Sequence, residues 1–172
     1  MKKLIVILGL LIAIFGWAQK PPPPAVDEKL PLDPPEQPIA FNHKLHVSKG
    51  VACKNCHAIK DPGFQAGYPK EAVCMGCHAI IKTDSPQIQK LAEHAKAKTA
   101  VPWVKVYQVP EYVWFSHASH VEDAKFECAT CHGPVAEREA LFKEKPTNMH
   151  SCMSCHAQHK APNGCDFCHN SQ

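Results

Sequence analysis

Hydrophobic residues are concentrated at the start of the chain, in an uncharged run that follows Lys2 and Lys3 and extends from residue 4 to residue 18. The run ends with Gly16 and Ala18, small residues of the kind that precede a cleavage site, so the pattern predicts an export signal over 1–18. As a helix these 15 residues rise about 22 Å, short of a hydrocarbon core of about 30 Å. A cleaved signal is therefore favoured over an uncleaved membrane anchor. Both predict a periplasmic location, free or on the periplasmic face of the inner membrane.

The segment 19–38 contains eight of the 16 prolines of the chain, beginning with four in succession. Proline has no backbone N–H and favours the extended polyproline conformation. The composition predicts a semi-rigid spacer or, equally, a disordered N-terminus of the mature chain. The folded part is expected to begin near Ile39.

Helical periodicity is clearest between Ser85 and Lys98, where apolar residues recur three and four positions apart and predict the longest helix. Between Pro102 and Pro110, the segment 103–107 alternates weakly between apolar and polar residues. It predicts a short strand or an extended connection.

The composition is poor in large apolar side chains, with 7 Phe, 3 Tyr and 3 Trp among 172 residues, but rich in ligand types, with 10 Cys and 12 His. A core built from protein alone would be thin, which indicates that a bound group fills the interior. The formal charge is only +3, without a dense basic run. Nucleic acid is therefore not an expected partner.

All ten cysteines fall into five Cys-x-x-Cys-His motifs: Cys53/Cys56/His57, Cys74/Cys77/His78, Cys128/Cys131/His132, Cys152/Cys155/His156 and Cys165/Cys168/His169. Two thiols three positions apart can each form a thioether with one vinyl group of the same porphyrin, and the adjacent histidine then supplies the proximal imidazole to iron. The sequence therefore predicts five covalently attached haem c groups.

Other uses of cysteine explain this pattern less well. Five disulfides would suit an exported chain, but they do not require five identical spacings, each followed by histidine. Zinc sites made only of cysteine use Cys-x-x-Cys pairs in twos, and five is odd. A thioredoxin-like motif would occur once, in a βαβ context that this sequence lacks.

Seven histidines lie outside the motifs: His43, His46, His94, His117, His120, His150 and His159. Four of them form a Phe-x-His-x-x-His segment that begins at Phe41, ahead of the first motif, and recurs at Phe115, ahead of the third. This internal repeat divides the chain into a module with two motifs, 39–99, and a module with three, 100–172.

The repeated segment ahead of Cys-x-x-Cys-His resembles the small class III cytochromes of the c3 and c7 families. The resemblance implies a mostly irregular and α-helical fold, with short helices packed around five haems and little or no β structure. It also implies that a second histidine caps each iron. The implied pairs are His43 with His57, His46 with His78, His117 with His132, His120 with His156, and His150 with His169.

Three further side chains remain as alternatives. His94 lies beside the apolar stripe of the predicted helix, where a solvated histidine is favoured over a ligand. His159 could replace His150 or His120. Met149 is the other candidate ligand, and an axial methionine would raise the potential of its haem.

Several stretches resemble the five-haem subunit of alternative complex III, a quinol-oxidising membrane assembly: residues 37–41, 74–78, 85–91, 102–117 and 131–134. The chain departs from that subunit at Met149-His150-Ser151. The resemblance implies redox partner proteins, namely iron–sulfur and quinone-binding membrane subunits and a downstream cytochrome or oxidase.

With about 26 residues for each haem, five porphyrins must lie close to one another, as they do in an electron carrier. The leading hypothesis is therefore an electron-transfer subunit rather than an enzyme, with no catalytic residues. A free periplasmic c7/c3-like shuttle is the alternative. A multihaem reductase is a third hypothesis, but it needs an open axial position or a proximal lysine, and no motif supplies that lysine.

Overall fold

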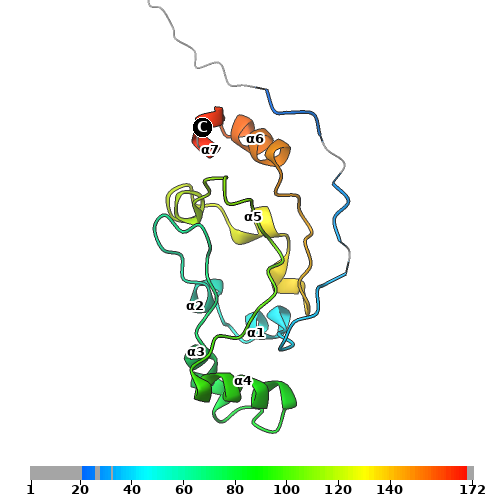
Figure 1. Cartoon of the computed structure of the whole chain (residues 1–172), viewed down its shortest axis with the longest axis vertical. Helices are drawn as coiled ribbons and strands as arrows, with labels where there is room; N and C mark the ends of the chain where they lie inside the picture. The colour runs from blue at the N-terminus through cyan, green and yellow to red at the C-terminus, as the bar shows by residue number, and fades with distance from the viewer. Residues whose placement is uncertain (1–20, 26–27, 32, 170–172) are drawn as a thin grey trace, which may run out of the picture.

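The computed structural model describes residues 21–25, 28–31 and 33–169, so the predicted export signal lies outside the described residues. Short helices joined by long irregular connections make up this part (Figure 1). They are α1 (His43–Ser48), α2 (Cys53–Cys56), α3 (Glu71–His78), α4 (Pro86–Ala97), the π-helix η1 (Ala118–Asp123), α5 (Cys128–His132), the 3-10 helix η2 (Val135–Glu137), α6 (Met149–Gln158) and α7 (Cys165–Cys168).

β structure in the described residues is limited to one isolated bridge, between Val113 and His169. The expected fold of short helices with little or no β structure is therefore confirmed. Residues 103–107 form an extended connection rather than a strand. No helix in the described part is long and apolar enough to cross a membrane.

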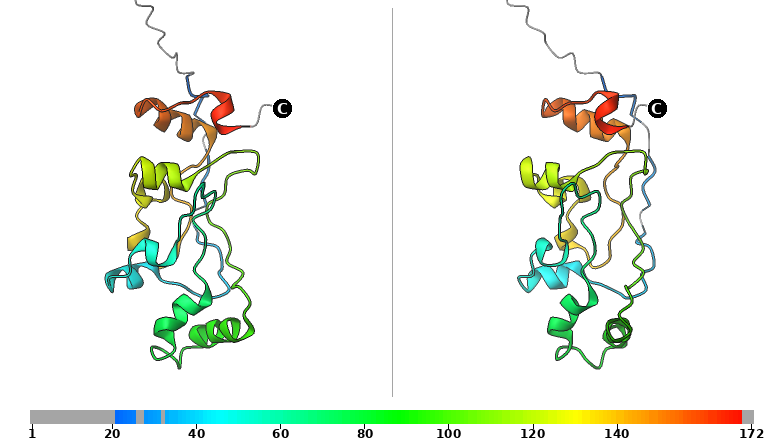
Figure 2. Two further views of the ribbon diagram at one scale, coloured as in Figure 1. Left: turned by 90° about the vertical axis from the view of Figure 1, so that its left-hand side faces the viewer. Right: turned by 60° about the vertical axis from the view of Figure 1, so that its left-hand side comes forward.

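The helices are stacked along the long axis of the molecule (Figures 1 and 2). Helices α3 and α4 lie at one end and α6 and α7 at the other, with α1, α2 and α5 between them. The two modules are not separate bodies, because the Lys44 N–H in the first donates to the Arg138 carbonyl in the second at 2.9 Å. The connection after α4 runs the length of the molecule, and the Trp114 N–H reaches the Cys168 carbonyl at 2.7 Å.

The apolar core is as small as the composition predicts. Its buried members among the described residues are Ile39, Leu91 and Val101, at the end of the molecule that holds α3 and α4. Helix α4 supplies Leu91 to this core, and it confirms the helix predicted between Ser85 and Lys98. It begins with Pro86 in its first turn, where the missing N–H of proline breaks no helical hydrogen bond. It ends at Lys98 in the left-handed conformation, with φ of 55°.

The described part of the proline-rich segment, predicted as a spacer or a disordered terminus, runs along both modules (Figure 1). The Gln37 side chain donates to the Val104 carbonyl at 2.9 Å and accepts from the Val104 N–H at 3.0 Å. At the other end, Glu28 pairs with Lys143 at 2.6 Å. Proline keeps its carbonyl as an acceptor, so an extended proline-rich chain can dock wherever donors face it.

Glu28 links this segment to the start of α6. Its carboxylate accepts from Lys143 and, at 2.9 Å, from the Asn148 amide, while the Asn148 oxygen caps α6 by accepting from the Ser151 N–H at 3.0 Å. The hydrogen bond from Lys143 is the main cause that holds the pKa of Glu28 below its usual range.

Replacing Glu28 with glutamine is expected to destabilise the fold by about 1 kcal/mol at pH 7, because Lys143 loses its counter-charge in a partly buried site. A carboxylate whose folded pKa is lowered contributes stability above its unfolded pKa and loses it as the pH falls through the folded pKa. Denaturant unfolding of Glu28→Gln and wild type should therefore differ at pH 7 and converge as the pH falls through the folded pKa of Glu28, below the usual range of a glutamate. Glu36→Gln, an exposed position in the same segment, is the matched control. Equal stability of Glu28→Gln and wild type at pH 7 would contradict the docking of the proline-rich segment through Glu28.

Candidate haem-binding sites

One cavity of about 2300 Å³ runs through the molecule, and each of the five motifs contributes a cysteine or a histidine to its lining. Four of the five predicted distal histidines also line it, namely His43, His46, His117 and His120. His150 is not among the described residues that line the cavity, and neither are His94 and His159. The donor set therefore fits a row of porphyrins: thiols for the vinyl groups and imidazoles for the irons.

Three of the predicted attachment residues depart from this arrangement. Cys77 and His78 of the second motif and Cys165 of the fifth are not among the described residues that line the cavity. The second motif therefore reaches the cavity through Cys74 alone. Cys77 and His78 are the last two residues of α3, which lies at one end of the molecule (Figure 1). The assignment of Cys77 as an attachment site stays a prediction that rests on the motif.

Every motif is helical, which places its two thiols on one side of the chain. Helices α2, α5 and α7 begin at the first cysteine of their motif, whereas α3 and α6 begin upstream of it. Residues three apart are neighbours on a helix surface, so one porphyrin edge can span both sulfurs of a pair. None of the ten thiols is joined in a disulfide.

Three of the predicted histidine pairs face each other in the structure. The ring centroids of His117 and His132 are 6.4 Å apart with an interplanar angle of 5°. Those of His46 and His78 are 6.1 Å apart, and those of His120 and His156 are 6.0 Å apart. A metal–nitrogen bond of about 2 Å, with the ring centre about 1 Å further on, separates two axial imidazoles by about 6 Å. The spacing of these rings suits one iron between each pair.

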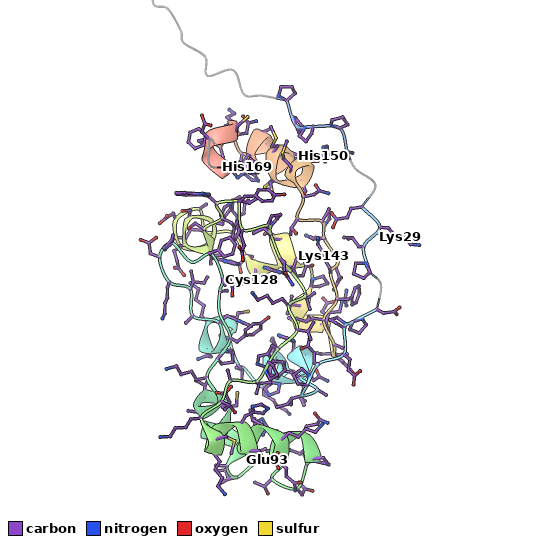
Figure 3. All side chains as sticks on the ribbon, viewed as in Figure 1. Lys29, Glu93, Cys128, Lys143, His150 and His169 are labelled. Carbon is purple, nitrogen blue, oxygen red and sulfur yellow. The ribbon has the colours of Figure 1, made fainter. Side chains whose placement is uncertain are left out.

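The remaining two pairs differ from each other. His43 is close to His57: burial lowers the pKa of His43 to about 4, and the charge of His57 lowers it further. His150 and His169 lie at the same end of the molecule (Figure 3). The His169 ring lies against Tyr112, with centroids 5.9 Å apart, while Nε2 of His150 faces the Ser154 hydroxyl at 3.4 Å.

Hydrogen bonds to backbone carbonyls set the tautomer of seven predicted ligands. Their Nδ1 atoms lie 2.5 to 3.0 Å from a carbonyl oxygen, in the pairs His46–Asn42, His57–Gly67, His78–Ile81, His117–Gly63, His120–Ser116, His150–Pro23 and His156–Pro162. A carbonyl only accepts, so the proton is on Nδ1 and Nε2 keeps its lone pair for a metal. His94 differs because its Nδ1 meets the Thr99 hydroxyl at 3.2 Å, and a hydroxyl allows either tautomer.

Two of the predicted ligands are also kept neutral by their surroundings. Burial lowers the pKa of His132, and the charge of the neighbouring His117 lowers it further. Burial likewise lowers the pKa of His43, and the charges of His57 and His46 lower it further. Nδ1 of His43 is buried and has no hydrogen-bond partner. A neutral imidazole is the form that binds a metal.

The repeated Phe-x-His-x-x-His segment has the same geometry in both copies. Phe41 meets His43 edge-on at 81° and stacks on His46 at 19°, and Phe115 meets His117 at 88° and stacks on His120 at 22°. One phenyl ring thus holds the two histidine planes nearly perpendicular, so that they face different irons. The polar residue after each phenylalanine, Asn42 or Ser116, accepts a hydrogen bond from a backbone N–H three positions on.

Tyr107 is a supporting residue that the sequence pattern did not single out. Its ring packs edge-on against His132 with centroids 4.4 Å apart, and its hydroxyl donates to the His132 carbonyl at 3.2 Å. The same oxygen accepts from the Glu144 N–H at 2.9 Å. The sequence marked this residue only as part of the connection between modules.

The Tyr107→Phe substitution should lower the free energy of unfolding by about 1–3 kcal/mol, because a partly buried N–H and a carbonyl lose their partner while the ring is kept. Equilibrium denaturation measures this loss. Tyr112→Phe, at a position that is 66% exposed, should leave stability within about 0.5 kcal/mol of wild type. Equal changes in the free energy of unfolding for the two substitutions would show that the Tyr107 hydroxyl does not stabilise the fold.

Of the three alternative ligands, His94 and His159 do not line the cavity, whereas Met149 does. His94 is on α4 and faces Thr99. His159 follows α6 and packs edge-on against Phe126, with centroids 4.8 Å apart. Met149 lines the cavity, although its side chain is 55% exposed.

Short helices, a minimal core and facing imidazoles beside Cys-x-x-Cys-His motifs define the class of multihaem c-type cytochromes. Comparison with known proteins agrees with this class. The family described as "Cytochrome c7 and related cytochrome c" matches residues 113–171, and the "Class III cytochrome C family" matches residues 20–102.

Two relatives extend the comparison. The chain is 30% identical over 190 residues to the menaquinone reductase, multihaem cytochrome c subunit, of Nitratidesulfovibrio vulgaris strain Hildenborough, covering 94% of this chain and 87% of that protein. It is 26% identical over 127 residues to the multihaem cytochrome MtrA of Shewanella baltica strain OS185, covering 72% of this chain and 29% of that protein. The chain belongs to the class III, c7/c3-like multihaem cytochromes c, which carry covalent haem c and transfer electrons.

Proposed function

We propose that this chain binds five haem c groups and is the cytochrome subunit of a quinone-linked membrane complex. The observation that carries the haem count is the one cavity to whose lining all five motifs contribute. The facing rings of His46 and His78, His117 and His132, and His120 and His156 support ligation by two histidines at three of the sites. The bound haems supply one-electron oxidation and reduction.

The same pairs favour an electron carrier over a reductase. An iron held between two imidazoles has no axial position for a substrate, and two of these pairs have both Nδ1 protons committed to carbonyls, which keeps Nε2 of both rings toward the metal. We propose His43 as the second ligand opposite His57, on the strength of their proximity. His150 remains our proposed ligand for the fifth iron, with the Pro23 carbonyl holding its tautomer.

The partner assignment rests on the relatives. A subunit of a menaquinone reductase aligns with nearly the whole chain, which favours a complex over a free shuttle. The stretches that resemble alternative complex III favour quinol oxidation as the direction of electron flow, whereas the name of the relative favours quinone reduction. In both directions we propose that the chain is exported and works on the periplasmic face of the inner membrane, with iron–sulfur and quinone-binding subunits as partners.

Purification of the tagged chain from native membranes tests this assignment. We expect iron–sulfur and quinone-binding subunits to co-purify, and a menaquinol analogue to reduce the haems of the isolated complex. Reduction by the quinol supports the quinol-oxidising direction, and reoxidation by a quinone after chemical reduction supports the reverse. Recovery of the haem protein alone from the soluble fraction would overturn the complex and favour the shuttle.

A further inference from the structure

We infer that the five haem attachment sites form a single file along the molecule, in the order second, first, third, fourth, fifth. The sites are numbered by their proximal histidines His57, His78, His132, His156 and His169. The inference rests on the proposed five haems and adds which sites are neighbours, which the order of the motifs in the sequence does not give.

The second and first sites are joined by α1. His43 and His46 lie one turn apart on this helix, and Phe41 sets their planes nearly perpendicular. His46 faces His78 of the second site at 6.1 Å, while His43 is close to His57 of the first. Cys74 of the second motif and Cys56 of the first both line the cavity.

The first and third sites are joined by direct contacts between the modules. Lys54, inside the first motif, pairs with Glu122 at 2.7 Å, and Glu122 lies in η1 just ahead of the third motif. The first cysteines of the two motifs, Cys53 and Cys128, both line the cavity.

Gly63, in the loop after the first motif, also contacts the third site. Its carbonyl accepts hydrogen bonds from the backbone N–H and from Nδ1 of His117, at 2.8 and 2.9 Å. Gly63 has φ of 65°, and a Cβ there would collide with the Lys60 carbonyl, so no other residue fits. The first module thus orients a ligand of the third site.

The third and fourth sites repeat the arrangement of the first pair. His117 immediately precedes η1 and faces His132, while His120 within η1 faces His156 at 6.0 Å. Cys131 of the third motif and Cys155 of the fourth both line the cavity. Lys145, on the connection to α6, donates to the carbonyls of Ala129 and Thr130 inside the third motif.

The fourth and fifth sites occupy the end formed by α6 and α7 (Figure 1). Cys152 on α6 and Cys168 on α7 both line the cavity. The second site, on α3, lies at the opposite end (Figures 1 and 2). The second and fifth sites are the two ends of the file, where electrons enter and leave the chain.

Electron paramagnetic resonance of the holoprotein tests this order. His46→Ala removes the ligand opposite His78 and gives the second site a high-spin ferric signal that no other site has. The relaxation rate of that signal depends steeply on the distance to the nearest other paramagnetic iron. In this background, the first site is deleted with Cys53→Ala and Cys56→Ala, or the third with Cys128→Ala and Cys131→Ala.

We expect deletion of the first site to slow the relaxation several-fold and deletion of the third to leave it unchanged. Slower relaxation after deletion of the third site would overturn the order, because it would make the second and third sites neighbours. Unchanged relaxation after deletion of the first site would overturn it as well. Remaining low-spin signals show that a variant is folded. If the variant without the first site does not fold, the variant without the third site tests the order by itself. Failure of the proposed five haems is distinguishable, because the parent chain would then show fewer than five haem spins.

Discussion

His117→Ala is expected to convert one haem from low spin to high spin and to shift its potential by on the order of 0.1 V, within the roughly 0.8 V that axial ligands span. The His117 ring is parallel to that of His132 at 6.4 Å, and its Nδ1 is committed to the Gly63 carbonyl, so Nε2 is the atom that faces the metal. Alanine removes the whole imidazole, including its contact with Gly63, and leaves the hydrogen bond from the residue 117 backbone N–H to the Gly63 carbonyl.

Absorption and paramagnetic resonance spectra measure the spin state, and a redox titration measures the potential. The matched control is His94→Ala, which removes a histidine that faces Thr99 and does not line the cavity. The control should leave every haem in its wild-type spin state. A fully low-spin spectrum of His117→Ala would contradict the proposed ligand pair.

Leu91→Ala is expected to cost about 2–5 kcal/mol of unfolding free energy, because it opens a cavity that a core this small cannot refill. Leu91 is 5% exposed and is the only buried residue of α4. It packs with Ile39 and Val101, and Cys74 and Met75 of α3 pack against the same cluster. The loss should therefore also loosen the second attachment site.

Denaturant unfolding of the holoprotein, followed by the spectrum of the haems and by circular dichroism, measures this cost. Ile80→Ala is the control, because Ile80 is 84% exposed and its loss should change stability by no more than about 0.5 kcal/mol. Similar stabilities for the two variants would mean that the haems, and not this cluster, hold α3 and α4 together.

The attachment chemistry and part of the ligand geometry could be predicted from the sequence because they are local. A Cys-x-x-Cys-His motif fixes its own three side chains within one helical turn. The repeat at Phe41 and Phe115 placed two histidines on each segment, and the phenylalanine holds them at fixed angles. The longest helix also followed from local spacing, since Leu91 is on the predicted apolar stripe.

Contacts over long stretches of sequence could not be predicted. The docking of the proline-rich segment depends on Glu28 meeting Lys143 and Asn148, residues more than 100 positions away, and proline composition carries no information about that contact. The hydroxyl of Tyr107 and the carbonyl of Gly63 act through backbone groups, which leave no mark in side-chain patterns. The position of Cys77 outside the cavity lining is a further case, because the motif is the same in all five copies and does not show that α3 lies at the end of the molecule. The order of the sites along the molecule also depends on long-range contacts, so the order of the motifs in the sequence does not predict it.

Intact-mass spectrometry of the exported chain under denaturing conditions tests the central claim most directly, because thioether-bound haem stays on the polypeptide. We predict the mass of the processed chain plus five haems, with none of the ten cysteines open to alkylation. A chain with no added tetrapyrrole, with fewer than five, or with alkylated cysteines would contradict the account.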